Sequence, residues 1–365
     1  MMTKEQMFEK LENVVSKIVS YNSNVLIITH NDLDGFVSAY CLEKLLQNKG
    51  ITTTVHSLSN KVMMHDFDNY CNKIKTNNYN TIVSLDVFNK KFLDKFKDKN
   101  YFAFDHHSGM KKHIGDNIIN ISNFFDIEDD IPSMGAYFYG YTIDKVSYPS
   151  WFSVVARFTD GLYKANEFFV PIDITNKNYL YGLPRIEILD FISFINSFYN
   201  YKLDIEDIYI PFKECIDSND LFYYKFSNSK ELIYLRKIQK IAEKEKYALL
   251  KKCLKKAKKC ITEKTIIFEI SEKENKVRRL VANTIEYLMD GYNILFLAKT
   301  SDGYIISFRT NNTKFDVIKN LKPIYDEYCH FEGHAYAAGG FVKTEFKKRF
   351  INDTIKILKN YNLKR

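Results

Sequence analysis

The feature that most constrains the fold is an alternation of short apolar runs with helical stretches in the first half of the chain. The apolar runs have the length and composition of buried strands and occupy 25–29, 51–56, 81–85, 101–104 and 117–120. Between them, stretches such as 36–47 have helical spacing. This alternation predicts an α/β fold with a parallel sheet and crossover helices. In such sheets, binding sites lie at the carboxyl ends of the strands.

The pattern stops and then restarts, which predicts two domains. Further helices are expected at 134–142, 150–159 and 185–199, followed by a long Lys- and Glu-rich helix from 229 to about 260. A second set of strands follows at 265–270, 293–298, 304–309 and 341–346, with helices at 276–289, 315–321 and 350–361. We expect an N-terminal parallel-sheet domain at 1–225, a helical linker at 226–263 and a smaller C-terminal α/β domain at 264–365.

Composition narrows the class of protein. Hydrophobic residues make up 45% and charged residues 27% of the 365 residues, which is ordinary globular composition. The formal charge of +8 suits a polyanionic partner, and the basic end of the linker is either a solvated face or a nucleic-acid contact. The six cysteines form no C-x-x-C pair, and we find no signal peptide and no apolar run long enough to span a membrane. We therefore expect a cytoplasmic protein with no membrane attachment.

Acidic and histidine residues follow the predicted strands of the first domain. His30, Asp32 and Asp34 come directly after the first strand, and the two-residue period of an extended chain places them on one side. Gly35 then allows a sharp turn into the next helix. The other members of the set are Asp86, after the strand at 81–85, the run Asp105, His106 and His107, after the strand at 101–104, and Asp160.

This set of side chains predicts a site for two metal ions. Carboxylates gathered at strand ends repel one another unless cations neutralise them. Carboxylate and imidazole ligands without thiolates favour Mn²⁺ or Mg²⁺. Two such ions clamp the attacking and leaving oxygens in phosphoryl transfer and lower the pKa of a bound water. A single Asp after a strand is more often a helix cap, so the prediction rests on the conjunction of the clusters.

The order of the motifs resembles the DHH phosphoesterase superfamily. The resemblance is carried by HNDLDG (30–35), SLD (84–86), DHH (105–107) and TDG (159–161) in the first domain. In the second domain, SFR (307–309) and GHAYAAGG (333–340) resemble the DHH-associated domain, which binds substrate. The H-x-D-L-D-G spacing is similar to that of the nanoRNase or oligoribonuclease (NrnB-like) type.

The resemblance implies a role for each matched residue. His30, Asp32 and Asp86 would bind one ion, and Asp34, Asp86, His106 and Asp160 the other. His107 would contact the scissile phosphate, and Asp86 and Asp105 would belong with it to the catalytic machinery. A neighbouring phosphate would be gripped by side chains and backbone N–H groups of Arg309, Gly333, His334, Gly339 and Gly340.

The function implied is metal-dependent hydrolysis of short single-stranded RNA or DNA, or of dinucleotides, to mononucleotides. The Gly-rich segment disfavours a pyrophosphatase, and the chain length disfavours a processive exonuclease with extra domains. Three alternatives stay open: a phosphatase acting on 3′-phosphonucleotides, a cyclic-nucleotide phosphodiesterase, and a nucleic-acid-binding module without catalysis. The sequence leaves the oligomeric state open, a homodimer included.

Overall fold

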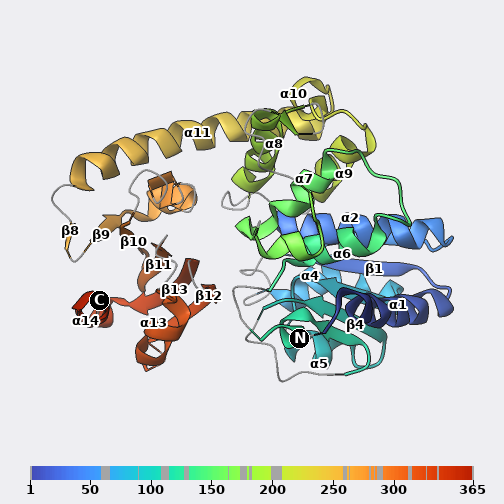
Figure 1. The fold of residues 1–365 in the computed structure, drawn as a ribbon, viewed down its shortest axis with the longest axis horizontal. Coiled ribbons are helices and arrows are strands. Elements are labelled where there is room, and N and C mark those ends of the chain that lie inside the picture. The colour runs from blue at the N-terminus through green and yellow to red at the C-terminus, as the bar shows by residue number, and fades with distance from the viewer. Residues whose placement is uncertain are drawn as a thin grey trace. The chain divides into compact units, whose positions relative to one another are not determined.

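The computed structural model divides the chain into two compact units. It describes residues 2–58, 66–88, 90–107, 115–126, 131–162, 164–172, 179–180, 183–198, 208–257, 261–262, 264–278, 281–282, 284–285, 291–310, 315–325, 327–334 and 337–363. The N-terminal unit comprises Met1–Tyr199 and Leu203–Arg236, and the C-terminal unit comprises Asn200–Lys202 and Lys237–Arg365. Helix α11 (Lys230–Ala257) crosses the division between them (Figure 1).

A five-stranded parallel sheet forms the centre of the N-terminal unit. Its strands, in chain order, are β1 (Val25–His30), β2 (Thr53–Leu58), β3 (Thr81–Leu85), β4 (Asn100–Asp105) and β5 (Ile118–Asn120). The order across the sheet is β2-β1-β3-β4-β5, so the direction of winding reverses between β1 and β3. The predicted α/β fold with a parallel sheet is confirmed. A reversal of this kind opens a crevice at the carboxyl ends of the two central strands.

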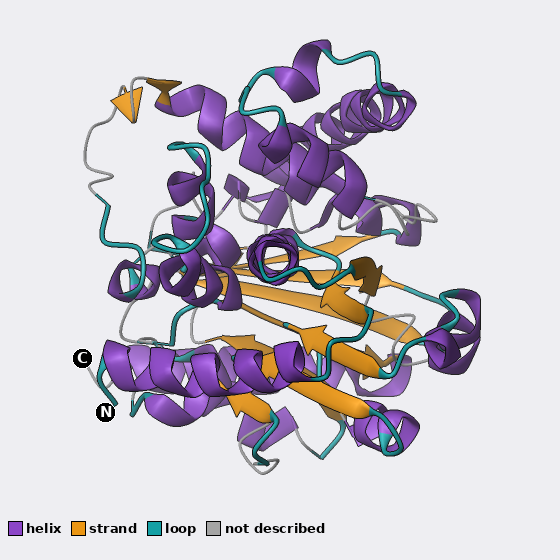
Figure 2. Ribbon diagram, turned by 90° about the vertical axis from the view of Figure 1, so that its right-hand side faces the viewer, coloured by secondary structure: helices purple, strands orange, loops and turns teal. Residues whose placement is uncertain are grey.

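Helices cover both faces of this sheet (Figure 2). On one face, α4 (Phe67–Lys73) and α5 (Lys90–Phe96) bury Phe67, Phe92 and Phe96 against the strands. On the other, α2 (Leu33–Asn48) packs against β1 and against α6 (Met134–Thr142), and α1 (Lys4–Ser20) contacts α6. The remaining helices of the unit are α7 (Phe152–Arg157), α8 (Arg185–Phe198), α9 (Tyr209–Asp217) and α10 (Tyr223–Phe226).

Short elements complete the unit. They are the 3₁₀ turns η1 (Thr76–Asn78), η3 (Ile121–Phe124), η5 (Thr159–Gly161) and η6 (Ala165–Phe168), and the strands β6 (Tyr179–Leu180) and β7 (Leu183–Pro184). The single helix predicted at 150–159 is wrong at its end, because α7 stops at Arg157. Asp160 has a left-handed backbone (φ 54°), which no α-helix accommodates.

The junction of β1 with α2 depends on Gly35. The Asp32 carboxylate caps α2 by accepting the Gly35 N–H at 3.0 Å, and Thr29 Oγ1 donates to the Gly35 carbonyl at 2.6 Å. A Cβ atom on residue 35 would lie 2.3 Å from the His30 carbonyl oxygen. Only glycine therefore lets the helix start this close to the end of the strand.

A mixed six-stranded sheet forms the C-terminal unit, with order β12-β13-β11-β10-β9-β8. Its strands are β8 (Ile261–Thr262), β9 (Thr265–Ile270), β10 (Asn293–Lys299), β11 (Gly303–Thr310), β12 (Cys329–His334) and β13 (Ala337–Lys343). One face packs on α13 (Val317–Tyr325) and α14 (Lys347–Leu363), with Tyr325 and Phe350 fully buried. The other packs on the C-terminal turns of α11 and on residues following η7 (Glu272–Val277).

Two features of this unit correct the sequence analysis. The strand predicted at 341–346 begins earlier, at Ala337, and its last three residues form the 3₁₀ turn η8 (Thr344–Phe346). The helix predicted from 276 starts as the 3₁₀ turn η7, and residues 286–289 lie outside the described part of the chain.

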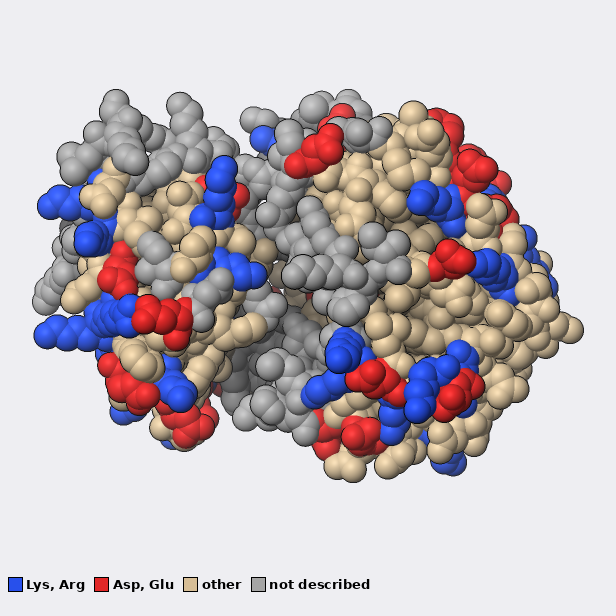
Figure 3. Space-filling model, turned by 90° about the horizontal axis from the view of Figure 1, so that it is seen from below, with Lys and Arg blue, Asp and Glu red and all other residues tan. Residues whose placement is uncertain are grey.

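The net charge of +8 is not gathered into one patch on the described part of the face viewed in Figure 3, where basic and acidic side chains are interspersed.

Among the described residues, no helix combines the length and apolar character needed to cross a bilayer.

Candidate metal centre

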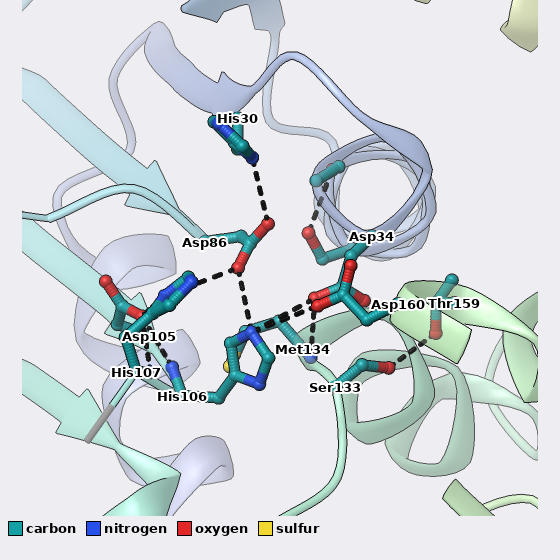
Figure 4. A network of polar contacts seen from close by, with 12 residues as sticks. His30, Asp34, Asp86, Asp105, His106, His107, Ser133, Met134, Thr159 and Asp160 are labelled. Carbon is teal, nitrogen blue, oxygen red and sulfur yellow. Dashed lines mark hydrogen bonds and ion pairs between the residues drawn. The ribbon is translucent and has the colours of Figure 1, made fainter. Parts of the chain in front are cut away.

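The carboxyl ends of β1, β3 and β4 bring the predicted site residues together. His30 is the last residue of β1, Asp86 follows β3, and Asp105 ends β4 immediately before His106 and His107. Figure 4 shows the Asp86 carboxylate between the rings of the three histidines. The site thus lies where the winding of the sheet reverses.

Asp86 is the member that all three histidines approach. Its Oδ2 lies 3.6 Å from His30 Nδ1, and its Oδ1 lies 3.3 Å from His106 Nε2 and 3.9 Å from His107 Nδ1. Asp86 has a left-handed backbone (φ 56°), and its N–H donates to the Phe104 carbonyl at 2.9 Å. Asp tolerates this conformation better than most residues, which lets the chain turn out of β3 while the carboxylate stays in the site.

In the part of the chain that the structure describes, three overlapping groups of side chains could each hold a metal ion. In each group, one ligand atom per residue lies within 4.8 Å of the others. The groups are His30, Asp32 and Asp86; Asp34, His106 and Asp160; and Asp86, His106 and His107. The first two match the partition that the family resemblance implies, with Asp86 adjoining both.

Asp34 is held by the N-terminus of α6. Its Oδ2 accepts the N–H of Met134 at 2.9 Å and its Oδ1 accepts that of Gly135 at 2.7 Å. The positive end of the helix dipole favours a carboxylate there. His106 Nε2 lies 3.8 Å from Asp34 Oδ2 and 3.3 Å from Asp160 Oδ2. The helix therefore fixes the position of Asp34 although it lies 100 residues away in sequence.

Hydrogen bonds orient the imidazole rings. His106 Nδ1 lies 3.2 Å from the Pro132 carbonyl, which can only accept, so Nδ1 carries hydrogen and Nε2 faces the acids. His30 Nδ1 lies 2.6 Å from Asp32 Oδ2. The buried Asp105 Oδ1 accepts from the backbone N–H of His106 at 2.6 Å, from that of His107 at 2.9 Å and from His107 Nδ1 at 2.7 Å.

Asp105 therefore differs from the other acids of the site. Among the described residues it belongs to none of the three ligand groups, and all its hydrogen bonds go to the two histidines that follow it. The side chain of His107 is half exposed. Its Nδ1 is directed to Asp105, which leaves Nε2 on the opposite side of the ring.

The electrostatics of the site favour a bound cation. Burial raises the pKa of Asp32, and it raises that of Asp34 well above its usual range with help from Asp160 and Asp86. Burial would also raise the pKa of Asp86, but the neighbouring imidazoles of His106 and His30 hold it well below its usual range. Burial would lower the pKa of His106, yet Asp160 and Asp86 raise it well above its usual value. The charge on Asp86 thus depends on positive neighbours.

The donor set fits Mn²⁺ or Mg²⁺. The buried Asp86 Oδ1 accepts no hydrogen bond from the described residues, although a buried carboxylate oxygen normally has a partner. Carboxylates and imidazoles without thiolates suit these ions. Every residue that the sequence analysis assigned to metal binding lies in this cluster.

The predicted substrate residues lie on adjacent strands of the C-terminal unit. The register places Arg309 of β11, Ala337 of β13 and His334 of β12 in one row across the sheet. Arg309 is half-buried and donates to the Phe308 carbonyl at 2.8 Å. The side chain of His334 lies outside the described part of the structure.

The glycines of this segment serve strand packing. Gly339 and Gly340 lie on β13, which pairs with both β11 and β12, so their backbone N–H groups face neighbouring strands. A Cβ on Gly340 would lie 2.1 Å from the His330 carbonyl oxygen, and one on Gly333, at φ 144°, would lie 2.4 Å from that of Ala337. The predicted contact of these N–H groups with a phosphate stays a prediction.

The structure also brings forward residues that the sequence analysis did not identify. Pro132, Met134 and Gly135 supply the backbone groups that hold His106 and Asp34. In the C-terminal unit, the buried Arg278 donates from Nε to Ser307 Oγ at 2.8 Å, two residues before Arg309 on the same face of β11. Only tertiary packing reveals these contacts, and no sequence pattern marks them.

Comparison with known proteins supports the fold. No protein-family model and no curated protein matches the chain. Among solved structures, it is similar to exonuclease RecJ bound to manganese (TM-score 0.60, 14% identity, 97% of this chain and 94% of that one). It is also similar to Thermus thermophilus RecJ in complex with Mn²⁺ (TM-score 0.65, 14% identity, 97% of this chain and 55% of that one). A third similar structure is the DHH domain of a member of a family of ribosomal proteins (TM-score 0.59, 12% identity, 98% of this chain and 91% of that one).

These likenesses confirm the DHH fold that the motifs indicate. The chain spans about half the length of the Thermus protein. At identities of 12–14% the likeness is one of fold, so the chemistry of the site has to be argued from its own residues.

Proposed function

We propose that this protein is a metal-dependent phosphoesterase that cleaves short single-stranded oligonucleotides or dinucleotides to mononucleotides. The observation that carries the proposal is the sharing of Asp86 between imidazole and carboxylate groups at the switch point of a parallel sheet. The likeness in fold to a RecJ exonuclease bound to manganese supports a nucleic-acid substrate and a divalent cation.

Two Mn²⁺ or Mg²⁺ ions are assigned to the cluster. His30, Asp32 and Asp86 would hold one, and Asp34, Asp86, His106 and Asp160 the other. When bound, the pair would activate water and neutralise the charge that develops on the phosphate. The hydrogen bonds of His106 to Pro132 and of Asp34 to α6 hold these ligands in place before any ion arrives.

His107 is assigned to the scissile phosphate. The pKa of His107 is pulled down by burial, but the Asp105 carboxylate raises it above its usual value. The raised pKa favours the doubly protonated ring, whose Nε2–H can donate to a phosphate oxygen as negative charge builds there. Asp105, whose side-chain hydrogen bonds within the described part of the chain all go to the two histidines, is assigned as the positioning residue for His107 rather than as a catalytic residue.

Arg309 is assigned to a second phosphate of the substrate, together with His334. A guanidinium suits phosphate because it can donate two parallel hydrogen bonds. An anchor of this kind favours substrates that carry a second phosphate, which is the basis for proposing oligonucleotides and dinucleotides.

The test is hydrolysis of an end-labelled dinucleotide by metal-free protein with and without Mn²⁺. We expect mononucleotide only when metal is present, and none with EDTA. Asp86→Ala should lower the rate by at least roughly 100-fold, because even indirect partners of a metal site cost about 10- to 100-fold. A matched control is Asp68→Ala. It removes an exposed carboxylate of α4 that pairs with Lys95 of α5, and it should leave the rate unchanged.

Other outcomes would point to the alternatives. Faster release of phosphate from a 3′-phosphonucleotide than of mononucleotide from the dinucleotide would favour the phosphatase. Preferential cleavage of a cyclic dinucleotide would favour the cyclic-nucleotide phosphodiesterase. Binding of oligonucleotides without hydrolysis under any metal would favour the binding module.

A further inference from the structure

A buried polar network joins the start of α6 to the turn that carries Asp160. At its centre is Asn166, which is fully buried. Its Oδ1 accepts the Ser133 N–H at 2.8 Å, and its Nδ2 donates to the carbonyls of Arg157 and Thr159, each at 3.1 Å. The hydroxyls of Ser133 and Thr159 are 2.5 Å apart, which closes the network. One amide side chain thus uses both its acceptor and its donors.

One branch of the network controls the backbone of Asp160. This residue has φ 54° and ψ 8°, a left-handed conformation that Asp tolerates better than most residues but that neighbouring contacts still have to hold. Thr159, its immediate neighbour, is held through its carbonyl by Asn166 and through its hydroxyl by Ser133. The Asp160 carboxylate is therefore aimed by contacts made one residue away.

The other branch controls Asp34. Ser133 is the N-cap of α6, and its Oγ accepts the Ala136 N–H at 3.2 Å. The backbone N–H groups of Met134 and Gly135, the two residues after Ser133, donate to the two oxygens of Asp34. Fixing Ser133 therefore fixes Asp34, and Asn166 is the group that fixes Ser133 and Thr159 at once (Figure 4 shows Ser133, Thr159, Asp34 and Asp160).

We propose that Asn166 is a positioning residue that sets the spacing of Asp34 and Asp160, and with it the affinity of the second metal ion. The inference rests on the metal binding put forward as the proposed function. No other common side chain of this size supplies both functions: Asp has no donor, and Leu has neither. Within the described part of the chain, none of the hydrogen bonds of Asn166, Ser133 and Thr159 involves His30, Asp32 or Asp86. Loss of the Asn166 side chain should therefore weaken the binding of one of the two ions and not of the other.

The experiment is a titration of metal-free protein with Mn²⁺, followed by electron paramagnetic resonance and calorimetry. Wild type should bind two ions that are magnetically coupled. Asn166→Ala should bind the first ion as wild type does and the second about 10- to 100-fold more weakly, with loss of the coupled signal at low metal. Phe92→Leu, in the core on the α4 and α5 face of the sheet, is the control for a general loss of stability and should bind both ions normally.

The remaining outcomes decide against the inference. Two ions bound by Asn166→Ala with wild-type affinity would overturn it, and so would an equal weakening of both ions, which would make Asn166 merely structural. Wild type that binds fewer than two ions would overturn the proposed function as well, and this is seen before any variant is made. If Asn166→Ala does not fold, Thr159→Val removes one hydroxyl at constant shape. It should weaken the second ion alone, and unchanged binding would overturn the inference.

Discussion

Replacing Asp105 by Asn should separate the orientation of His107 from the binding of metal. In the folded protein, Asp105 Oδ1 accepts the ring Nδ1–H of His107 at 2.7 Å, a short hydrogen bond to a charged acceptor. Bonds to a charged acceptor contribute about 1.5–3 kcal/mol and neutral bonds about 0.5–1.5 kcal/mol, so loss of the charge should cost about 1–1.5 kcal/mol, or roughly 5- to 13-fold in rate. The uncharged amide oxygen of Asn can still accept the two backbone N–H groups and the ring N–H, so the fold should be retained.

The assay is hydrolysis of bis-p-nitrophenyl phosphate and of a labelled dinucleotide with Mn²⁺. Asp105→Asn should lower kcat by that factor on both substrates, with KM and Mn²⁺ stoichiometry unchanged. Because Asp105 raises the pKa of His107, its loss lets the ring deprotonate at lower pH. The decline of activity on the alkaline side should therefore begin at lower pH than in wild type.

Asp105→Ala serves as the comparison. It should lose more activity than Asp105→Asn, because it has no acceptor for the His107 ring N–H, and be less stable by about 1–3 kcal/mol, since the buried His106 N–H loses its acceptor. The reasoning is refuted if Asp105→Asn retains activity within two- to three-fold, or if it loses bound Mn²⁺, which would make Asp105 part of the metal site.

Three further predictions address packing, protons and the substrate anchor. Gly135→Ala would place a Cβ 2.9 Å from Asp34 Oδ1 and 3.0 Å from Val37 Cγ1, so urea denaturation should show a loss of about 1–3 kcal/mol; unchanged stability would contradict the close contact of α2 with α6. The raised pKa of His106 stabilises metal-free protein at low pH, and this contribution fades as pH rises through that pKa. Mn²⁺ must displace the proton, so its affinity should rise with pH and calorimetric heats should depend on the buffer; buffer-independent heats would count against this. Arg309→Ala should raise KM for dinucleotides by roughly 10- to 150-fold and affect bis-p-nitrophenyl phosphate much less, and equal losses would rule out an anchoring role.

The parts of the fold that sequence reasoning predicted best are those with a single strong local signal. The strands at 81–85 and 265–270 and the helix at 134–142 occupy the predicted residues. The sequence also indicated that the candidate residues after β1, β3 and β4 would gather, because each set follows a recognisable buried strand and parallel strands bring their carboxyl ends together. Asp160 follows helix α7 instead, and the family motif pointed to it. Helix α1 was missed, although Thr3 and Gln6 form a capping box and its buried residues recur at helical spacing.

Other parts depend on contacts that the local sequence does not record. The Gly-rich segment contributes the end of β12 and the start of β13, because pairing of β13 with both β11 and β12 overrides the weak strand preference of glycine. Helix α13 continues past the predicted end at 321, through Pro323, because Tyr325 is buried against Phe350 and bonds Thr354. The network of Asn166 lies deeper still, since it joins residues that are 33 positions apart.

The central claim is that the Asp and His cluster binds two divalent cations around Asp86. The most direct test is an anomalous difference map, recorded at the manganese absorption edge, from crystals of protein loaded with Mn²⁺. We predict two peaks: one in contact with His30, Asp32 and Asp86, and one in contact with Asp34, Asp86, His106 and Asp160. A map with no peak in the cluster, or with both peaks on other residues, would contradict it.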